Sequence, residues 1–365
     1  MKKFKYSFAK YPKNNLFLEK IFQAASSLDD KLSNLDVNSL NISEYNKRYF
    51  GDHIKTNGAR KLNLTKYSYV LAWALNNVAK PLNEIVFLDY GAGHGFLSLL
   101  AKELGVGKVI HNDIYAVSSI DAKIIAENLK LEANEYITGD INDVINFLNL
   151  NNLNCHSMGS YDVIEHIYDI DEFLNKNHLL SNDTISIFHA SAANENNPRI
   201  NRMLKKTHLI IENTGRDLKP GRKATDASRP LIEIRKDIIR AIKPSLSDDE
   251  ISLLSKNTRG MIKDDIETAI NNYISKSIMP KPDGHATNTC DPNTGNWYEH
   301  LMNPYELFKI LESQGFEGKV MSGYYDSPKS LHIKFVKEFL NICISASGEK
   351  GLFFAPFYAL YAFKS

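Results

Sequence analysis

The chain has 365 residues, of which 43% are hydrophobic and 24% are charged, and its formal net charge at pH 7 is +1. This composition indicates a globular protein with enough apolar material for one large domain or two smaller ones. The near-zero charge argues against a nucleic-acid partner, and no apolar run is long enough to span a membrane. Three widely spaced cysteines favour a reducing compartment without a zinc site, and the basic N-terminus lacks the apolar run of a signal peptide, so we expect a cytoplasmic protein.

The first part of the chain, residues 1–80, is expected to be helical. Residues 14–50 are polar-rich with a helical pattern. A second helix is predicted at about Leu64 to Ala79, because apolar side chains recur there on one face.

The region from Ile85 to Gly105 reads as a strand, a glycine turn and a helix. Its apolar run is short and β-rich, as in a buried parallel strand, and Asp89 ends it. Glycines at 91, 93 and 95 follow, and then a helical pattern that Gly105 stops. Glycines allow a sharp turn and a close approach of the backbone to a ligand, so this region is typical of a nucleotide-binding α/β sheet.

Two further acids follow predicted strands. Asp113 ends a strand that begins at Val109, and Asp140 ends one that begins at Glu135, with a crossover helix between them. An acid after the second strand can accept hydrogen bonds from both hydroxyls of a ribose. Strand-end acids are also common helix caps, which is the alternative interpretation of each one taken alone.

The order Asp-x-Gly-x-Gly-x-Gly resembles motif I of the class I S-adenosylmethionine (AdoMet)-dependent methyltransferases. The segment from Tyr161 to Asp169, YDVIEHIYD, is similar to the DVLEH-type segment after strand four in methyltransferases related to the ubiquinone-biosynthesis O-methyltransferases. The resemblance covers roughly residues 64–192 and a C-terminal closing segment. It identifies the superfamily and no individual protein.

The resemblance implies a Rossmann-like α/β sheet of seven strands, the last one antiparallel, preceded by N-terminal helices. This chain departs from a regular member of the family by a helical insertion after strand five. It implies AdoMet as methyl donor, with an acid near the adenine amino group and the next apolar residue against the ring. N-terminal helices often cover the cofactor in this superfamily; Tyr49 and Lys66 could contact it, although ordinary surface and core roles are favoured. The residues assigned to the cofactor are Asp89, Gly91, Ala92, Gly93, Gly95, Asp113, Ile114, Asp140, Ile141 and Tyr161.

Methyl transfer from a sulfonium is an in-line displacement that needs mostly positioning, and a hydroxyl acceptor also needs a base. His166 is the first candidate for this base because imidazole titrates near neutral pH, and Asp162 and His300 are further catalytic candidates. His189 is a reserve. Asp162, Glu165 and His166 match positions that bind a divalent metal in the ubiquinone-type relatives. One helical turn rarely supplies a full site, so we assign no metal ligands and do not expect Mg²⁺.

Strand five is predicted at Thr184 to Ala190, after which the chain inserts about a hundred residues before it returns. Helices are predicted in the insertion at Leu231 to Ile242, Asp248 to Lys256 and Asp264 to Ile278. By family analogy, such an insertion shapes the acceptor pocket. The C-terminal part of the chain, which returns to the sheet after the insertion, is predicted to contain two helices and two strands. These are a helix from Asn303 to Gly315, strand six at Phe316 to Tyr325, a helix at Leu331 to Ile344 and a last strand at Phe353 to Phe363. We expect that strand at the edge of the sheet, where Pro356 is tolerated. Four domains are expected: an N-terminal helical cap at 1–80, an AdoMet-binding Rossmann-like core at 81–192, a helical insertion that binds the acceptor at 193–300, and a C-terminal segment at 301–365 that completes the sheet.

Charge in the insertion favours an anionic acceptor. Between Arg199 and Lys243 there are thirteen Lys and Arg against five Asp and Glu. A basic lobe can steer an anionic substrate, and arginines are suited to phosphate or carboxylate. A solvated basic face is the alternative. The arginines proposed as clamps are Arg199, Arg202, Arg216 and Arg222.

The loop from Asn288 to His300 is rich in turn formers and polar groups and holds Trp297. Such loops suit sugars, since an aromatic ring stacks on apolar sugar faces, although a tryptophan can also simply anchor a loop. The prediction is therefore an AdoMet-dependent O-methyltransferase for a small anionic or saccharide-type acceptor. The alternatives are an aromatic or quinone-like acceptor, and a catalytically silent AdoMet-binding scaffold. Nucleic-acid methylation is rejected because the Asn/Asp-Pro-Pro-aromatic motif is missing after strand four. The oligomeric state is left open.

Overall fold

The structure is a computed structural model. None of the helices in its described part is long and apolar enough to cross a membrane. The residues that it describes are 4–215, 229–282, 284–326 and 331–365.

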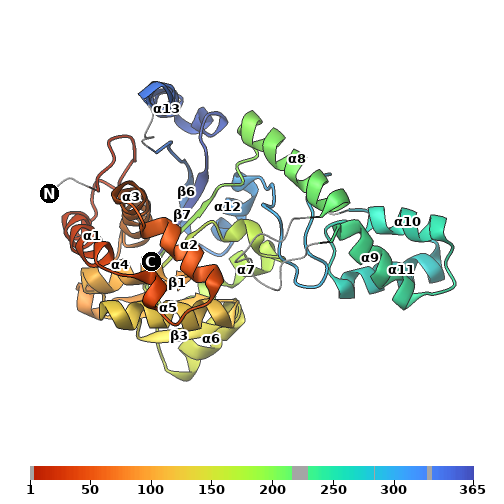
Figure 1. The fold of residues 1–365 in the computed structure, drawn as a ribbon, viewed down its shortest axis with the longest axis horizontal. Helices are drawn as coiled ribbons and strands as arrows, with labels where there is room; N and C mark the ends of the chain where they lie inside the picture. Colours follow the sequence, from red (N-terminus) through yellow and green to blue (C-terminus); the bar gives the residue numbers. More distant parts are fainter. Residues whose placement is uncertain (1–3, 216–228, 283, 327–330) are drawn as a thin grey trace. The chain divides into compact units, whose positions relative to one another are not determined.

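The chain forms two compact units, which we call the sheet unit and the helical unit (Figure 1). The chain passes from the sheet unit into the helical unit and back twice. The division into four segments that the sequence suggests stays a prediction. The sheet unit comprises Met1–Ile164, Asp171–Ser191 and Pro304–Ser365, and the helical unit comprises Glu165–Ile170 and Ala192–Asn303.

Among the described residues, seven strands form one sheet in the order β3-β2-β1-β4-β5-β7-β6. The first five strands are parallel, and β7 runs antiparallel to both of its neighbours. This confirms the predicted Rossmann-like sheet. The strand order changes direction between β1 and β4, where open α/β sheets bind ligands at their carboxyl ends. The strands are β1 Val86–Tyr90, β2 Lys108–Asp113, β3 Glu135–Thr138, β4 Ser157–Tyr161, β5 Ile185–Ser191, β6 Glu317–Ser322 and β7 Tyr358–Lys364.

The position of the last strand differs from the prediction. β7 lies between β5 and β6, so the predicted edge position is wrong, and β6 is the strand at the edge. Phe353 belongs to a short 3-10 helix, and Pro356 precedes the strand. Without a proline inside it, β7 can pair through its backbone on both sides.

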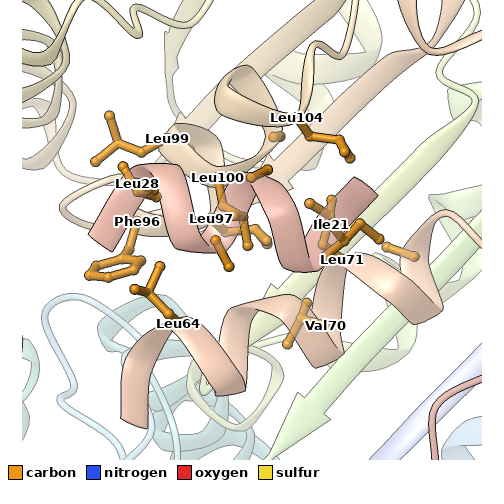
Figure 2. Close-up of a cluster of buried hydrophobic side chains, with 14 of the residues drawn as sticks. Ile21, Leu28, Leu64, Val70, Leu71, Phe96, Leu97, Leu99, Leu100 and Leu104 are labelled. Carbon is orange, nitrogen blue, oxygen red and sulfur yellow. The ribbon is translucent and has the colours of Figure 1, made fainter. Parts of the chain in front are cut away.

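The N-terminal helices pack on the sheet unit's helix α4. Figure 2 shows the labelled leucine, isoleucine, valine and phenylalanine side chains of α1, α3 and α4 gathered into one apolar cluster. The helix α3 begins before the predicted start, because the Thr56 side chain caps it by accepting a hydrogen bond from the amide of Ala59. The helices of the sheet unit include α1 Leu18–Ser33, α2 Glu44–Ile54, α3 Asn57–Ala74, α4 Phe96–Leu104, α5 Ala116–Leu129, α6 Ile141–Leu150, α12 Pro304–Ser313 and α13 Leu331–Ala346; α7 is Ile170–Lys176.

In its described residues, the helical unit contains the three predicted helices and one more. The additional helix α8 was missed, although Asn197 caps it and Pro198 opens it, two standard start signals. The capping box predicted at Ser247 is present, with Glu250 as its partner. The small apolar core of this unit joins Ile239, Leu254 and Ile270. The helices are α8 Pro198–Thr214, α9 Leu231–Ile242, α10 Asp248–Asn257 and α11 Lys263–Lys276.

Candidate functional site

The glycine turn after β1 adopts backbone conformations that only glycine tolerates well. Gly91 and Gly93 have φ of 65° and 56°. A Cβ on Gly91 would lie 2.5 Å from the Val163 side chain, whereas one on Gly93 would have no heavy atom within 4 Å. The first glycine is therefore needed for packing, and the second faces open space, as a close backbone approach to a ligand requires.

Asp113 ties this turn to the end of β2. Its Oδ2 accepts a hydrogen bond from the Gly93 amide at 2.8 Å, and its Oδ1 accepts one from the Tyr115 amide at 2.9 Å. The side chain is buried beside the open space above Gly93. Each carboxylate oxygen can accept a second hydrogen bond, so Asp113 can still receive ligand hydroxyls.

Asp89 is placed differently from Asp113. It is 3% exposed, and its Oδ2 accepts hydrogen bonds from the amide and the hydroxyl of Ser98. Burial raises the pKa of Asp89 from 3.8 to about 7, although the two Ser98 hydrogen bonds lower it. In this structure Asp89 fastens β1 to the first turn of α4, and its predicted cofactor contact stays a prediction.

The third acid, Asp140, caps α6 and forms a capping box with Asp143. This is the helix-cap role that the sequence left open as an alternative. The following residue, Ile141, is 4% exposed and offers little surface to a ligand. Ile114, which follows Asp113, is 63% exposed and is the more accessible apolar surface for an adenine ring.

His94, inside the glycine turn, is the docking point for α2, which the sequence analysis missed. Its buried ring lies 5.0 Å from Tyr49, 5.2 Å from Phe50 and 4.8 Å from His53 between ring centroids. Burial lowers the pKa of His94 well below the usual value, so the ring is neutral. Its Nδ1 has no hydrogen-bond partner in the described part of the chain.

The N-terminus of α2 is held by a buried acid of α5. Asp121 accepts hydrogen bonds from the Ser43 amide and hydroxyl and from the Asn46 amide group. Ser43 is also the N-cap of α2. Together with the aromatic contacts of His94, these bonds hold α2 against the ligand-binding edge of the sheet.

The helix α3 contributes Lys66 and Tyr67. The Lys66 Nζ lies 4.6 Å from the centroid of the Tyr67 ring and 4.3 Å from that of Tyr161, at the end of β4. Tyr67 in turn stacks on Phe96, the first residue of α4, at 5.0 Å. Burial lowers the pKa of Lys66, and the nearby Asp162 carboxylate raises it. The sequence favoured ordinary surface and core roles for Tyr49 and Lys66. The structure places Tyr49 beside the glycine turn and Lys66 beside the end of β4.

Asp162 follows β4 directly and adopts φ of 56°, which is uncommon for a residue other than glycine. Its amide donates a hydrogen bond to the Ala190 carbonyl at 2.9 Å, so the backbone is tied to the end of β5. The side chain is exposed. The geometry leaves the carboxylate accessible at the ligand-binding edge of the sheet unit.

The other two catalytic candidates belong to the helical unit. His166 places Nδ1 2.8 Å from the Trp297 carbonyl. Since a carbonyl only accepts, Nδ1 carries the proton and the basic lone pair is on Nε2. His300 stacks on the Trp297 ring, with 4.1 Å between centroids. His189, the reserve base, is fully buried in β5 with its pKa lowered to about 3, so that prediction is wrong.

Trp297 does not have the role predicted for its loop. Its ring is 4% exposed, stacks on Tyr168 at 5.9 Å and on His300, and its Nε1 donates to the Tyr168 carbonyl. A ring covered in this way cannot stack on a sugar, so the prediction of sugar stacking by Trp297 is wrong. Its role is the alternative one, the anchoring of a polar loop.

The basic residues of the insertion divide into two groups. Arg235 is fully buried, paired with Glu212 and bonded to the Ser255 carbonyl, so it is unavailable to a substrate. Arg199 and Arg202 are exposed on α8, and no ion pair is recorded for them among the described residues. Arg216 and Arg222 lie outside the described residues. Within the described part, no group of three or more His, Cys, Asp or Glu could hold a metal ion.

Comparison with known proteins gives one curated relative. The chain is 35% identical over 71 residues to a ribosomal protein L11 methyltransferase from Methylobacillus flagellatus. The match covers 20% of this chain and 23% of that protein, so the chain spans about a quarter of the length of the curated relative that it matches. No family model matches the chain.

Several solved structures are similar at low identity. An AdoMet-dependent methyltransferase from Mesorhizobium loti is 14% identical, with a TM-score of 0.36, over 78% of this chain and 93% of that one. One from Archaeoglobus fulgidus is 16% identical, with a TM-score of 0.33, over 78% and 88%. PKMT2 from Rickettsia typhi, in complex with AdoHcy, is 12% identical, with a TM-score of 0.37, over 78% and 49%. At these scores the fold assignment rests on the strand order of this chain.

Proposed function

We propose that the protein is an AdoMet-dependent methyltransferase. One observation carries the proposal: the open glycine turn at Gly93 and the Asp113 carboxylate lie together at one edge of the sheet. Both lie beside the point where the strand order reverses, which is where this kind of sheet binds nucleotides. The match to motif I of the class I methyltransferases supports AdoMet over other nucleotides.

The residues present suit this cofactor. A carboxylate that still has lone pairs suits ribose hydroxyls, and the exposed Ile114 beside it suits the adenine face. The backbone at Gly93 leaves room for close contact with a ligand. Bound AdoMet supplies a methyl group on a sulfonium, and the protein's part is to hold the acceptor in line with it and to exclude water.

We further propose that the acceptor is a hydroxyl on a small anionic molecule, such as a phosphate-linked sugar. Arg199, Arg202 and Lys206 are exposed on α8 at helical spacing, which supports binding of a phosphate or carboxylate. A hydroxyl acceptor has to lose its proton, and the tautomer of His166 leaves Nε2 able to take it. A protein acceptor is the alternative that the name of the curated relative suggests.

The first test of the cofactor is calorimetric titration of S-adenosylhomocysteine (AdoHcy). Ile114→Ser should weaken binding about 5- to 30-fold, because it removes an apolar surface worth about 1–2 kcal/mol on burial. Ile120→Ser is the matched control, since Ile120 is 60% exposed on α5 and should leave the affinity unchanged. Wild-type protein that binds neither AdoHcy nor AdoMet would contradict the proposed function.

The acceptor is tested by AdoHcy release with a panel of phosphate-linked sugars, neutral sugars, quinols and proteins. We expect turnover with the phosphate-linked group and a higher KM in Arg199→Gln and Arg202→Gln with little change in kcat. Turnover with neutral acceptors alone would remove the anionic part of the proposal. Cofactor binding without turnover for any acceptor would favour the silent scaffold.

A further inference from the structure

A cation is held between two aromatic rings at the end of β4. The Nζ of Lys66 lies 4.6 Å from the Tyr67 centroid and 4.3 Å from the Tyr161 centroid, and the two rings are 6.4 Å apart at an interplanar angle of 62°. Both distances are well within the 6 Å over which a ring face attracts a cation. The two rings therefore form a binding place for positive charge, which we call the tyrosine pair.

This placement of Lys66 is not what a surface lysine adopts by default. A lysine usually extends its amine into water, because burial removes the hydration of the ammonium group. Burial lowers the pKa of Lys66, and the Asp162 carboxylate only partly opposes this. The ring faces and Asp162 thus compensate for lost water, and they would do so for any other cation that reached the same place.

The tyrosine pair lies at the ligand-binding edge of the sheet. Tyr161 is the last residue of β4, one of the two strands at the reversal of strand order. Tyr67 stacks on Phe96, the residue that follows the glycine turn. The turn and the strand end are in direct proximity, since a Cβ on Gly91 would lie against Val163.

We propose that the tyrosine pair binds the sulfonium of AdoMet, and that Lys66 occupies this place in the ligand-free protein and leaves it when AdoMet binds. The inference rests on the proposed function. The two ring faces cannot hold two positive charges at once. The tyrosine rings therefore favour binding of the sulfonium, and the Lys66 ammonium competes with the sulfonium for the same place. Tyr67 and Tyr161 are then positioning residues for the reacting centre, and Lys66 is an internal competitor.

The inference predicts a selectivity that depends on charge. AdoMet and AdoHcy share the adenosine and amino-acid parts, but the sulfur of AdoHcy is a neutral thioether. Removal of a ring should therefore weaken the binding of AdoMet more than that of AdoHcy. Removal of the Lys66 charge should strengthen the binding of AdoMet more than that of AdoHcy. A change in shape alone would alter both affinities by the same factor.

The experiment is calorimetric titration of both ligands into the wild type, Tyr161→Leu and Lys66→Met, with thermal melts to verify folding. In Tyr161→Leu we expect the ratio of AdoMet to AdoHcy affinity to fall about 2- to 30-fold, the range for one cation–ring contact. In Lys66→Met the ratio should rise by at least about twofold. Lys61→Met is the matched control, an exposed lysine on the same helix, and should leave the ratio unchanged.

Equal changes for both ligands in Lys66→Met would overturn the inference, because they would mean that Lys66 contacts a part that the two ligands share. An unchanged ratio in Tyr161→Leu would also overturn it. If Tyr161→Leu fails to fold, Tyr67→Leu gives the same comparison from the other ring. Failure of both ligands to bind the wild type would instead contradict the proposed function, so the two failures can be distinguished.

Discussion

Two buried acids of the sheet unit and one of the helical unit are stabilised in opposite ways. In the sheet unit, Asp89 and Asp113 accept hydrogen bonds from amides and a hydroxyl, and no ion pair with lysine or arginine is recorded for them among the described residues. In the helical unit, Glu212 pairs with Arg235, lies 3.5 Å from Arg259 and accepts a hydrogen bond from Thr289.

This difference separates a ligand site from a structural network. An acid that is met only by neutral donors keeps its charge available to a ligand, and Asp113 lies beside open space. The charge of a buried acid that is paired with two arginines is already compensated, so the Glu212 network serves to hold helices and the Trp297 loop together. Charge in a sequence therefore indicates function only after its internal pairing is known.

The largest expected effect comes from breaking the Glu212 network. Arg235→Met should destabilise the helical unit by about 3–5 kcal/mol, because it leaves a buried carboxylate without its main partner. Hydrogen-exchange mass spectrometry in increasing urea would measure the two units separately. Arg240→Met, which removes a half-exposed ion pair, is the control and should cost less than about 1 kcal/mol. Equal loss of protection in the sheet unit would contradict the independence of the two networks.

The second effect concerns the glycine turn. Gly91→Ala should cost about 2–4 kcal/mol, since its positive φ is unfavourable for alanine and the new methyl group would displace Val163. Gly93→Ala should cost only about 1–2 kcal/mol, because only the φ penalty applies. Urea unfolding of both variants measures the difference. Equal costs would mean that the packing of Val163 against the turn has been misjudged.

A third effect is the pH dependence of the sheet unit. The pKa of Asp89 is raised in the folded state from 3.8 to about 7, so the folded protein binds the proton more tightly than the unfolded chain does. Its contribution to stability is therefore present at low pH and is lost as the pH rises towards 7. Asp89→Asn should remove about 1–3 kcal/mol of the decline between pH 5 and pH 8. An identical decline in wild type and variant, measured by urea unfolding at each pH, would refute this assignment.

The smallest effect on stability is expected on the exposed face of α8. Arg199→Gln combined with Arg202→Gln should change the free energy of unfolding by less than about 0.5 kcal/mol, because neither side chain is buried. Thermal melts would measure this. The same variant should raise the KM for an anionic acceptor, in contrast to Arg235→Met, which acts on stability. A marked loss of stability would place these arginines with the structural group.

Much of the sheet unit could be predicted from the sequence because its signals are local. Asp89, the three glycines and Asp113 lie in consecutive strand ends and turns, and parallel pairing brings them to one edge. The docking of α2 on His94 could not be predicted, because it depends on contacts between residues far apart in the chain. The histidine inside the glycine run was the only available signal.

The helical unit shows the same limit. The helix α9 was predicted with its observed bounds from periodicity alone. The same pattern could not indicate that Arg235 points into a buried network or that the Trp297 ring stacks on Tyr168 and His300. The order of the last two strands failed for a related reason, since pairing partners in a sheet are chosen by tertiary contacts and not by the strand's own residues.

The central position of β7 has a consequence for how the protein is made. Synthesis proceeds from the N-terminus, so β5 emerges long before Tyr358–Lys364, its pairing partner. During that interval the backbone of β5 is an open edge that can join a wrong strand, and β6 has no neighbour at all. The sheet can close only after the whole helical unit has left the ribosome, which makes the arrival of β7 the step that covers the open edge of β5.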